Sequence, residues 1–392
     1  MLILEAGRLG GKMGMIKIFN KYHFPITVDK YIFQPFEEQL IREGSYSQVF
    51  RQIRATRGLR INKQDNDLYK KKHRLIDGNI INFCYDDISQ HRGNAYRYVV
   101  ESLARPILEN LPDSKGFAGL TERPLKKMNC RFFNSTRIKQ QGKIPVGPFD
   151  IFFSHGIGDK NYWIGKHIKD FEYAFVPGPA WEKRMRDTGY KGEIFICGYT
   201  KLDPIINSVK EKKNKKKKKI LWMPTHGYSS KHKGRSSYPQ CLELIHQISS
   251  QYDAELALHP TSKLNKKEKN IPTLEQLKDA DVVIADAGSN IYEAWILGIP
   301  VILPDWICKK DVLGHFKSDK NNFEYRIYNE GIGYHAKDMK DLNNLIDIAL
   351  SNGMKDKEID FIESIYPSEI RGKAGELAAS QLIEIAKIKK II

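Results

Sequence analysis

The segment DADVVIADAGSNIYEAWILGIPVILPD (residues 279–305) joins two kinds of structure. A short apolar run predicts a buried strand, a helical segment follows, and a second apolar run ends in Pro-Asp. The turn between strand and helix is made of small and polar residues: Asp286, Ala287, Gly288, Ser289 and Asn290. Two explanations fit this turn. Either Ser289 or Asn290 caps the helix with Glu293 in a capping box, or the free N–H groups of the first turn bind a phosphate.

The second explanation gives each polar residue a chemical task. Gly288 lets the backbone approach a ligand closely, while Ser289 and Asn290 add side-chain donors to the N–H groups of the first turn. Glu293 lies on the same helix face as Ser289 and Asn290, so its carboxylate could accept the hydroxyls of a ribose. We therefore expect Asp286, Gly288, Ser289, Asn290 and Glu293 to contribute to a donor-binding site.

The sequence around this segment alternates between strands and helices. Strands are predicted at ILWMPTHG (residues 220–227), AELALHPT (254–261), DVVIA (281–285) and IPVILPD (299–305), with helical segments between them. This β-α-β-α-β-α-β order is typical of a doubly wound parallel sheet. Ligands of such sheets bind beyond the carboxyl ends of the strands.

A weaker alternation precedes the run VKEKKNKKKKK (residues 209–219). Strands are predicted within FDIFFSHGIG (149–158), YAFVPGPAWEKRMRDTG (173–189) and GEIFICGYTKLDP (192–204), and the second of these continues into a helix. We assign no topology to the first 145 residues. We expect an N-terminal acceptor-side domain over 1–208, a Lys-rich linker over 209–219, a nucleotide-donor domain over 220–345 and helices over 346–392. Two such Rossmann-like domains facing a central cleft make an α/β fold of the GT-B type.

Composition excludes several classes of protein. The chain has 392 residues, 41% of them hydrophobic and 28% charged, which indicates a globular protein. No apolar run approaches the ~20 residues of a membrane span, and no signal peptide is evident, so we expect a cytoplasmic protein. Five scattered cysteines form no CxxC pair, which argues against a disulfide framework or a zinc site and favours buried thiols.

The formal net charge of +17 favours anionic partners, such as phosphate-bearing substrates, an anionic membrane or nucleic acid. The alternative is a Lys-rich surface with no such role. The basic, amphipathic segment ASQLIEIAKIKKII (379–392) suits either contact with the inner face of the membrane or packing across the two domains.

Further polar residues follow other predicted strands. A histidine at a strand end supplies a base near neutral pH, which suits His155 of SHG, with Gly156 beside it, for removing a proton from an acceptor hydroxyl. His259 of LALHP could donate to a diphosphate or a leaving group. Turn chemistry alone also explains each of these motifs. The other candidates at strand ends are Thr225 and His226 of MPTHG and Gly198, Lys201 and Asp203 of CGYTKLD.

Taken in order, SHG, VPGPAWEKRM, ICGYTKLD, MPTHG, LALHP and ADVVIADAGSNIYEAWILGIPVI resemble the CDP-glycerol glycerophosphotransferase family of teichoic-acid and capsule primases and polymerases. The resemblance implies a catalytic base at His155, a donor-phosphate contact at His259, and a pyrophosphate turn at Asp286, Gly288 and Ser289. It covers residues 149–305 and differs where the family has Asp-Tyr-Ser-Ser and this chain has Asp-Ala-Gly-Ser-Asn. Glu293 followed by Ala294 is similar to many nucleotide-sugar glycosyltransferases.

The leading hypothesis is a metal-independent transferase for cell-surface polymer synthesis. It would move a glycerol-phosphate, another polyol-phosphate or a sugar from a CDP- or UDP-linked donor to an anionic polymer or lipid-linked acceptor, with no cofactor. His155 would take the acceptor proton, and Glu293 would hold the ribose. Charge on the departing nucleotide would be neutralised by His259, Thr225, Ser289 and Asn290. One alternative is a GT-B glycosyltransferase that modifies nucleic acid. Another is a nucleotide-binding or membrane-surface scaffold without activity.

Overall fold

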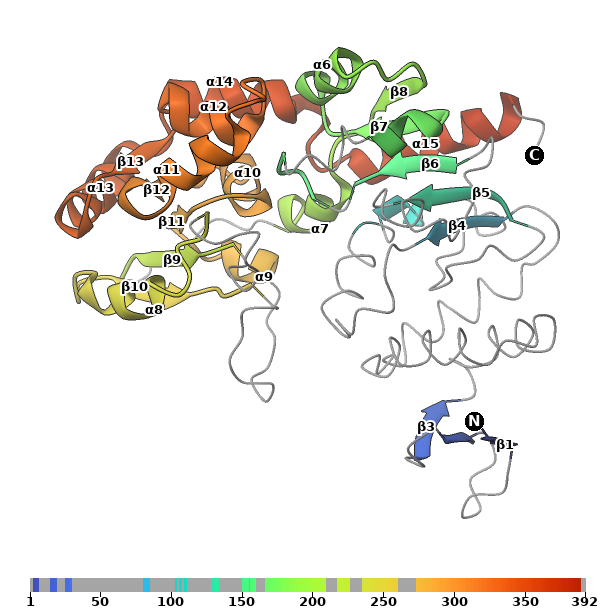
Figure 1. Cartoon of the computed structure of the whole chain (residues 1–392), viewed down its shortest axis with the longest axis horizontal. Coiled ribbons are helices and arrows are strands. Elements are labelled where there is room, and N and C mark those ends of the chain that lie inside the picture. Colours follow the sequence, from blue (N-terminus) through green and yellow to red (C-terminus); the bar gives the residue numbers. More distant parts are fainter. Residues whose placement is uncertain are drawn as a thin grey trace.

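The computed structural model describes the following residues: 3–6, 15–19, 25–29, 80–84, 103, 106–107, 109–110, 128–133, 150–154, 156–159, 166–208, 217–225, 235–259 and 273–388. Two parallel sheets dominate these residues, and they lie side by side in Figure 1. A separate antiparallel sheet of order β1-β2-β3 is formed by β1 (Ile3–Ala6), β2 (Met15–Phe19) and β3 (Pro25–Asp29).

The first parallel sheet has the order β4-β5-β6-β7-β8, so its strands follow one another in space as they do in the sequence. Its strands are β4 (Ile80–Cys84), β5 (Met128–Phe133), β6 (Asp150–Phe153), β7 (Tyr173–Val176) and β8 (Glu193–Ile196). Its described helices are η2 (Lys166–Asp170), α6 (Pro179–Asp187), η3 (Thr200–Leu202) and α7 (Asp203–Ile206). Pro179 begins α6, where its fixed φ suits a helix and its missing N–H is not needed.

The second parallel sheet has the order β10-β9-β11-β12-β13. β10 lies on one side of β9, and after β10 the chain crosses to the other side of β9, where it forms β11, β12 and β13. Its strands are β9 (Lys219–Met223), β10 (Asp253–Leu256), β11 (Val282–Ala285), β12 (Val301–Pro304) and β13 (Tyr334–Ala336). The helices of this half are α8 (Cys241–Leu244), η5 (Ile245–Gln247), α9 (Thr273–Leu277), α10 (Ser289–Ile296), α11 (Asp305–Phe316), α12 (Phe323–Glu330), α13 (Met339–Asn352) and α14 (Asp356–Ile365). The strands predicted within 220–305 are confirmed.

Both faces of the second sheet are covered. Along β11, Val282 and Ile284 belong to one apolar cluster, and Val283 and Ala285 belong to another. Successive side chains of a strand point to opposite faces, so a strand buried on both sides reads as a continuous apolar run. This is why VVIA lacks the alternation of a half-exposed strand. Three cysteines whose side chains are described, Cys197, Cys241 and Cys308, are free and buried, as expected.

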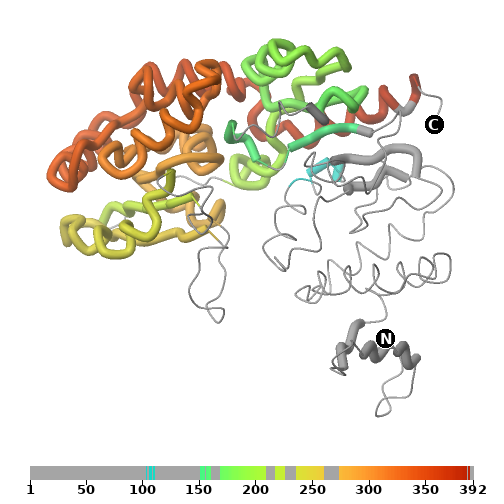
Figure 2. The backbone as a smooth tube through the Cα atoms, in the orientation of Figure 1, coloured from blue at the N-terminus to red at the C-terminus, as the bar shows by residue number. Residues whose placement is uncertain are grey.

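The last helix returns to the first half of the molecule. After α14 and η6 (Ser368–Ile370), α15 (Ala374–Ile388) runs beside the first parallel sheet, and Figure 2 traces this path. Its residues Ala378, Leu382 and Ile385 are buried in the larger apolar cluster together with Leu103 and Ile107. The apolar face of α15 therefore packs inside the protein.

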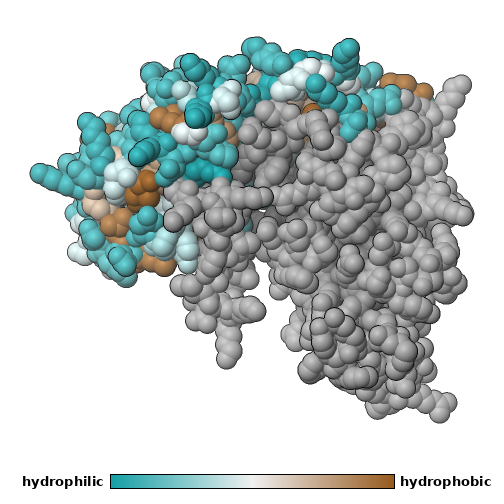
Figure 3. All heavy atoms as spheres, in the orientation of Figure 1, coloured by the Kyte–Doolittle hydropathy of each residue, from teal (hydrophilic) through white to brown (hydrophobic). Residues whose placement is uncertain are grey.

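The described part of the face in Figure 3 is mostly hydrophilic, with scattered apolar patches. Within the described ranges, we find no helix with the length and apolar character that crossing a membrane requires.

Candidate active site

Two loops meet where the sheets face each other. The first follows β6 and comprises residues 154–159, of which 155 is not described; we call it the β6 loop. The second comprises residues 286–290 after β11; we call it the β11 loop. The Gly158 N–H donates a hydrogen bond to Ser289 Oγ at 3.3 Å. The carboxyl ends of both sheets, where ligands of such folds bind, thus lie against each other.

The β6 loop needs glycine at positions 156 and 158 because the two loops approach each other so closely there. A Cβ added at Gly158 would lie 2.9 Å from the backbone of Gly288 and Ser289, and one added at Gly156 would lie 2.9 Å from Ser289 Oγ. Real Cβ atoms almost never approach other atoms that closely, so a larger residue would push the loops apart. The glycines of SHGIG therefore permit contact between the loops.

Asp286 organises the β11 loop from inside. Its side chain is fully buried, and Oδ1 accepts hydrogen bonds from the N–H groups of Thr225 (2.8 Å) and Ala287 (2.7 Å). Oδ2 accepts from the N–H and the hydroxyl of Ser237, at 2.6 and 2.7 Å. Burial raises the pKa of Asp286, and these hydrogen bonds oppose that shift. The oxygens of the Asp286 side chain are thus engaged by N–H and O–H groups of the protein, and the residue fixes the β11 loop.

The first turn of α10 is not closed by a capping box. Gly288, at φ 84°, is the N-cap, and no side chain caps the helix. The Gly288 N–H donates to Glu324 Oε1 at 3.1 Å. The N–H groups of Ser289 and Asn290 meet no acceptor among the described residues. The structure therefore does not contain the capping box that was one of the two explanations for this turn. The N–H groups of Ser289 and Asn290 remain at the positive end of α10.

Glu293 is paired with the other half of the molecule. Its side chain is 1% exposed, and Lys201 Nζ lies 3.1 Å from Oε1. Tyr199 also donates its hydroxyl to Oε1, at 3.4 Å. Glu293 and Lys201 come from separate motifs of the sequence, and the fold joins them in a contact between the two halves.

The remaining candidates on the second sheet lie at its carboxyl edge. Thr225 follows β9 and is buried; its carbonyl accepts from the Ser236 hydroxyl at 2.6 Å. His259 follows β10, the neighbouring strand, and is half-buried. Asn290 Nδ2 lies 3.5 Å from the Met223 carbonyl at the end of β9. His155 and His226 lie outside the described residues.

Gly198 and Asp203 lie beside the C-terminal helices. Gly198 has φ 81°, and an added Cβ would lie 2.7 Å from the Tyr366 ring and 2.8 Å from Ala374 Cβ. Asp203 Oδ2 accepts from the Gly375 N–H at 2.6 Å. Burial raises the pKa of Asp203 to about 6, against the effect of its backbone hydrogen bonds. These two residues thus connect the first sheet to α15, away from the contact between the loops.

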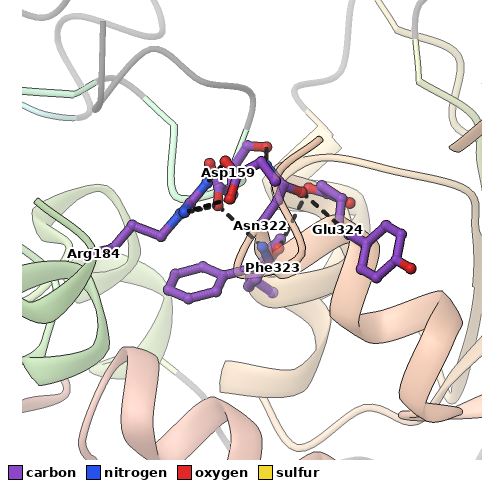
Figure 4. A network of polar contacts seen from close by, with 8 residues as sticks. Asp159, Arg184, Asn322, Phe323 and Glu324 are labelled. Atoms are coloured by element: carbon purple, nitrogen blue, oxygen red, sulfur yellow. Dashed lines mark hydrogen bonds and ion pairs between the residues drawn. The ribbon is translucent and has the colours of Figure 1, made fainter. Parts of the chain in front are cut away.

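A polar network that the sequence analysis did not identify surrounds the two loops (Figure 4). Its members come from the β6 loop, from α6, from the turn between α11 and α12 and from the first turn of α12: Asp159, Arg184, Asp319, Asn322 and Glu324. A charged residue in the loop after a buried strand is a usable signal, and Asp159 is the residue that follows the quoted segment FDIFFSHGIG. The other members have no such signal in the sequence. Among the described residues, no group of three or more His, Cys, Asp or Glu residues could hold a metal ion.

Two parallel α/β sheets whose carboxyl ends face each other, with a last helix that returns to the first sheet, define the GT-B fold. Comparison with solved structures agrees. The chain is similar to the wall teichoic acid polymerase TagF: a histidine variant with CDPG matches at a TM-score of 0.52 and 14% identity, over 88% of this chain and 99% of that chain.

A second structure of the same TagF variant matches at a TM-score of 0.52 and 15% identity, over 88% of this chain and 99% of that chain. At such identities the likeness is one of fold, and the fold is that of the class that the sequence motifs resemble. No family model and no curated protein matches the chain.

Proposed function

We propose that this protein transfers a glycerol-phosphate, another polyol-phosphate or a sugar from a nucleotide donor to an acceptor hydroxyl in cell-surface polymer synthesis. The observation that carries the proposal is the contact of the β6 loop with the first turn of α10, at 3.3 Å between Gly158 N and Ser289 Oγ. The described residues on either side of position 155 belong to this loop, and their contact with the turn that carries two N–H groups suited to an anion supports the role proposed for His155. The fold shared with a wall teichoic acid polymerase supports the same class of chemistry.

In this proposal, donor phosphates bind at the first turn of α10, with Ser289 and Asn290 as donors and His259 and Thr225 nearby. His155 removes the proton of the acceptor hydroxyl, and the acceptor oxygen attacks the phosphorus of a polyol-phosphate donor or the anomeric carbon of a sugar donor. The bond from that atom to the nucleotide phosphate breaks, and the nucleotide leaves with the electron pair of that bond. Stabilising the charge that develops on the nucleotide phosphates lowers the barrier to transfer. Glu293 would bind the ribose after exchanging its partner Lys201 for the hydroxyls. We propose that the acceptor and donor domains divide at residues 209–219, which follow α7 and end on the first residue of β9.

A thermal-shift panel tests donor binding. CDP-glycerol, CDP-ribitol and CMP-, UDP- and GDP-linked sugars are added separately, and the matching donor should stabilise the protein by about 2.7 kcal/mol at 100 times its dissociation constant. Asn290→Ala should weaken this stabilisation. Ser351→Ala is the matched control, because Ser351 lies on the exposed side of α13. If no nucleotide stabilises the protein, the donor assignment is wrong.

Turnover of the matching donor tests the base. His155→Ala should lower kcat by about 100-fold or more, as expected for loss of a general base. Near-full turnover of the variant would overturn the role of His155 while leaving donor binding intact.

A further inference from the structure

The first turn of α12 holds both loops at once (Figure 4). Asn322 Nδ2 donates to the Asp159 carbonyl at 3.0 Å, and the Phe323 N–H donates to Asp159 Oδ2 at 3.0 Å. The next residue, Glu324, accepts the Gly288 N–H at 3.1 Å. Three consecutive residues therefore fix one end of the β6 loop and the N-cap of α10. The separation of the two loops depends on this turn.

Arg184 of α6 makes a second connection to the same place. Its Nε donates to Asp159 Oδ2 at 2.5 Å, and its two terminal nitrogens donate to the two oxygens of Asp319 at 3.1 and 2.6 Å. Asp319 precedes α12, so Arg184 joins the two halves of the molecule. A two-pronged arginine–carboxylate contact fixes orientation as well as distance.

The charges in this cluster depend on one another. Asp159 is fully buried and Arg184 is 5% exposed. Burial lowers the pKa of Arg184, but the hydrogen bond with Asp319 and the charge of Asp159 outweigh that effect, so the pKa is raised overall. Removal of one partner would leave a buried charge without compensation, which is strongly unfavourable.

Aromatic packing supports the same junction. Trp181 of α6 and Phe323 of α12 meet edge to face, with ring centroids 4.9 Å apart and planes at 72°. The Arg184 guanidinium lies 5.8 Å from the centroid of the Phe323 ring. The polar cluster therefore sits on a packed contact between α6 and α12.

We propose that Arg184, Asp319 and Asn322 are positioning residues, which clamp the β6 loop to α12 and so set its distance from the first turn of α10. The inference rests on the proposed function, because there this distance separates the acceptor-side base from the donor phosphates. Such residues touch no substrate. Their loss should displace the β6 loop while the donor site on the β11 loop stays formed.

Hydrogen exchange tests the clamp without reference to activity. Asp319→Asn keeps the shape of a partly exposed side chain and removes its charge, and Arg184→Lys keeps the charge and removes the planar fork. Lys183→Ala is the control on the same helix, because its side chain is 77% exposed and pairs with Asp187. In both clamp variants, peptides covering 154–159 should exchange faster than in wild type, while β9 and β11 and the control variant are unchanged.

Kinetics with the matching donor give the second readout. We expect kcat to fall about tenfold to hundredfold in Asp319→Asn, since small misplacements of reacting groups have effects of that size. The donor KM should change by less than about threefold, because the donor site is kept. A role in stability alone would lower the melting temperature without this split.

Unchanged exchange of the 154–159 peptides in both variants overturns the clamp. Faster exchange with wild-type kcat overturns its role in positioning. If wild-type protein turns over none of the donors, the proposed function has failed, and the exchange experiment by itself still supports or overturns the clamp.

Discussion

The β6 and β11 loops occupy corresponding places at the carboxyl ends of two sheets, but they are held differently. The β11 loop is fixed by its own half: Asp286 accepts four hydrogen bonds there, and the Tyr328 hydroxyl donates to the Asp286 carbonyl at 2.6 Å. The β6 loop has contacts from the opposite half, where Ser289, Asn322 and the Phe323 backbone bind it.

This difference separates two properties of the candidate active site. The hydrogen bonds of Asp286 that fix the β11 loop lie within its own half, and only Ser289 Oγ of this loop accepts a described hydrogen bond from the other half. The β6 loop reaches its observed position through several contacts that cross between the halves. A relative movement of the halves should therefore disturb the β6 loop more than the β11 loop.

The largest effect is expected from Asp286→Ala. It leaves the N–H groups of Thr225, Ala287 and Ser237 without their acceptor in a buried site, and each such loss costs about 1–3 kcal/mol. We expect the free energy of unfolding, measured in urea, to fall by about 3–5 kcal/mol. Asp286→Asn keeps the shape and one oxygen and should lose less. A loss below about 1 kcal/mol for Asp286→Ala would contradict an internally fixed loop.

Lys201→Met tests a contact between the halves. It leaves the buried Glu293 carboxylate without its cation, and breaking a buried pair in this way costs about 3 kcal/mol. The double variant Lys201→Met/Glu293→Met should recover most of that loss, because both charges are gone. Chemical denaturation of wild type, the two single variants and the double variant measures the energetic coupling between Lys201 and Glu293. Simple additivity of the two single changes would show that the pair is not coupled.

Asp203, which accepts a hydrogen bond from α15, should make the free energy of unfolding depend on pH. This dependence measures how much the connection to α15 contributes, for comparison with the two loops. Its pKa is raised to about 6, so the folded state keeps a proton that the unfolded state releases above its ordinary pKa. Its contribution to stability is full below about pH 4 and is lost as pH rises through 6. Relative to Asp203→Asn, wild type should lose about 2–3 kcal/mol of unfolding free energy between pH 4 and 7.

The smallest effect is expected from Gly156→Ala, at about 1–2 kcal/mol of unfolding free energy from overpacking. The added methyl group would meet Ser289 Oγ, so Ser289→Ala in the same chain should restore stability. Gly158→Ala provides the contrast, because its added methyl group would meet backbone atoms of the β11 loop. Ser289→Ala should not restore that variant. Equal recovery of both glycine variants would mean that the loops do not touch as described.

Much of the second sheet could be predicted because its strands are continuous apolar runs that end in turn residues. The helices α11 and α12 were not predicted, whereas α14 lies within the helices expected over 346–392. The buried faces of α11 and α12 are defined by contacts with distant segments, which a local pattern does not contain. The helical segment predicted between the strands at 220–227 and 254–261 is represented in the structure by the short helices α8 and η5.

In the candidate site, too, features within one local segment could be predicted, and contacts between distant segments could not. The β11 loop was identified from a strand–turn–helix pattern within a few residues. The link between Arg184 and Asp319 spans 135 positions, so no local spacing could have predicted it. Similarly, Glu293 was predicted from its place on the helix after the 286–290 turn, and Lys201 was predicted separately because it follows a strand in the motif CGYTKLD. Neither pattern predicted that the two side chains pair with each other.

The return of α15 to the first sheet has a consequence for how the chain is made. Pro106 lies within 2.6 Å of a Cβ added at Gly375, so the helix that covers Leu103 and Ile107 is synthesised some 270 residues after them. On the ribosome, the first sheet must wait for the whole second sheet to emerge before its own apolar surface is covered. The half of the protein that is translated first thus has Leu103 and Ile107 covered by α15 only after the second sheet has been made.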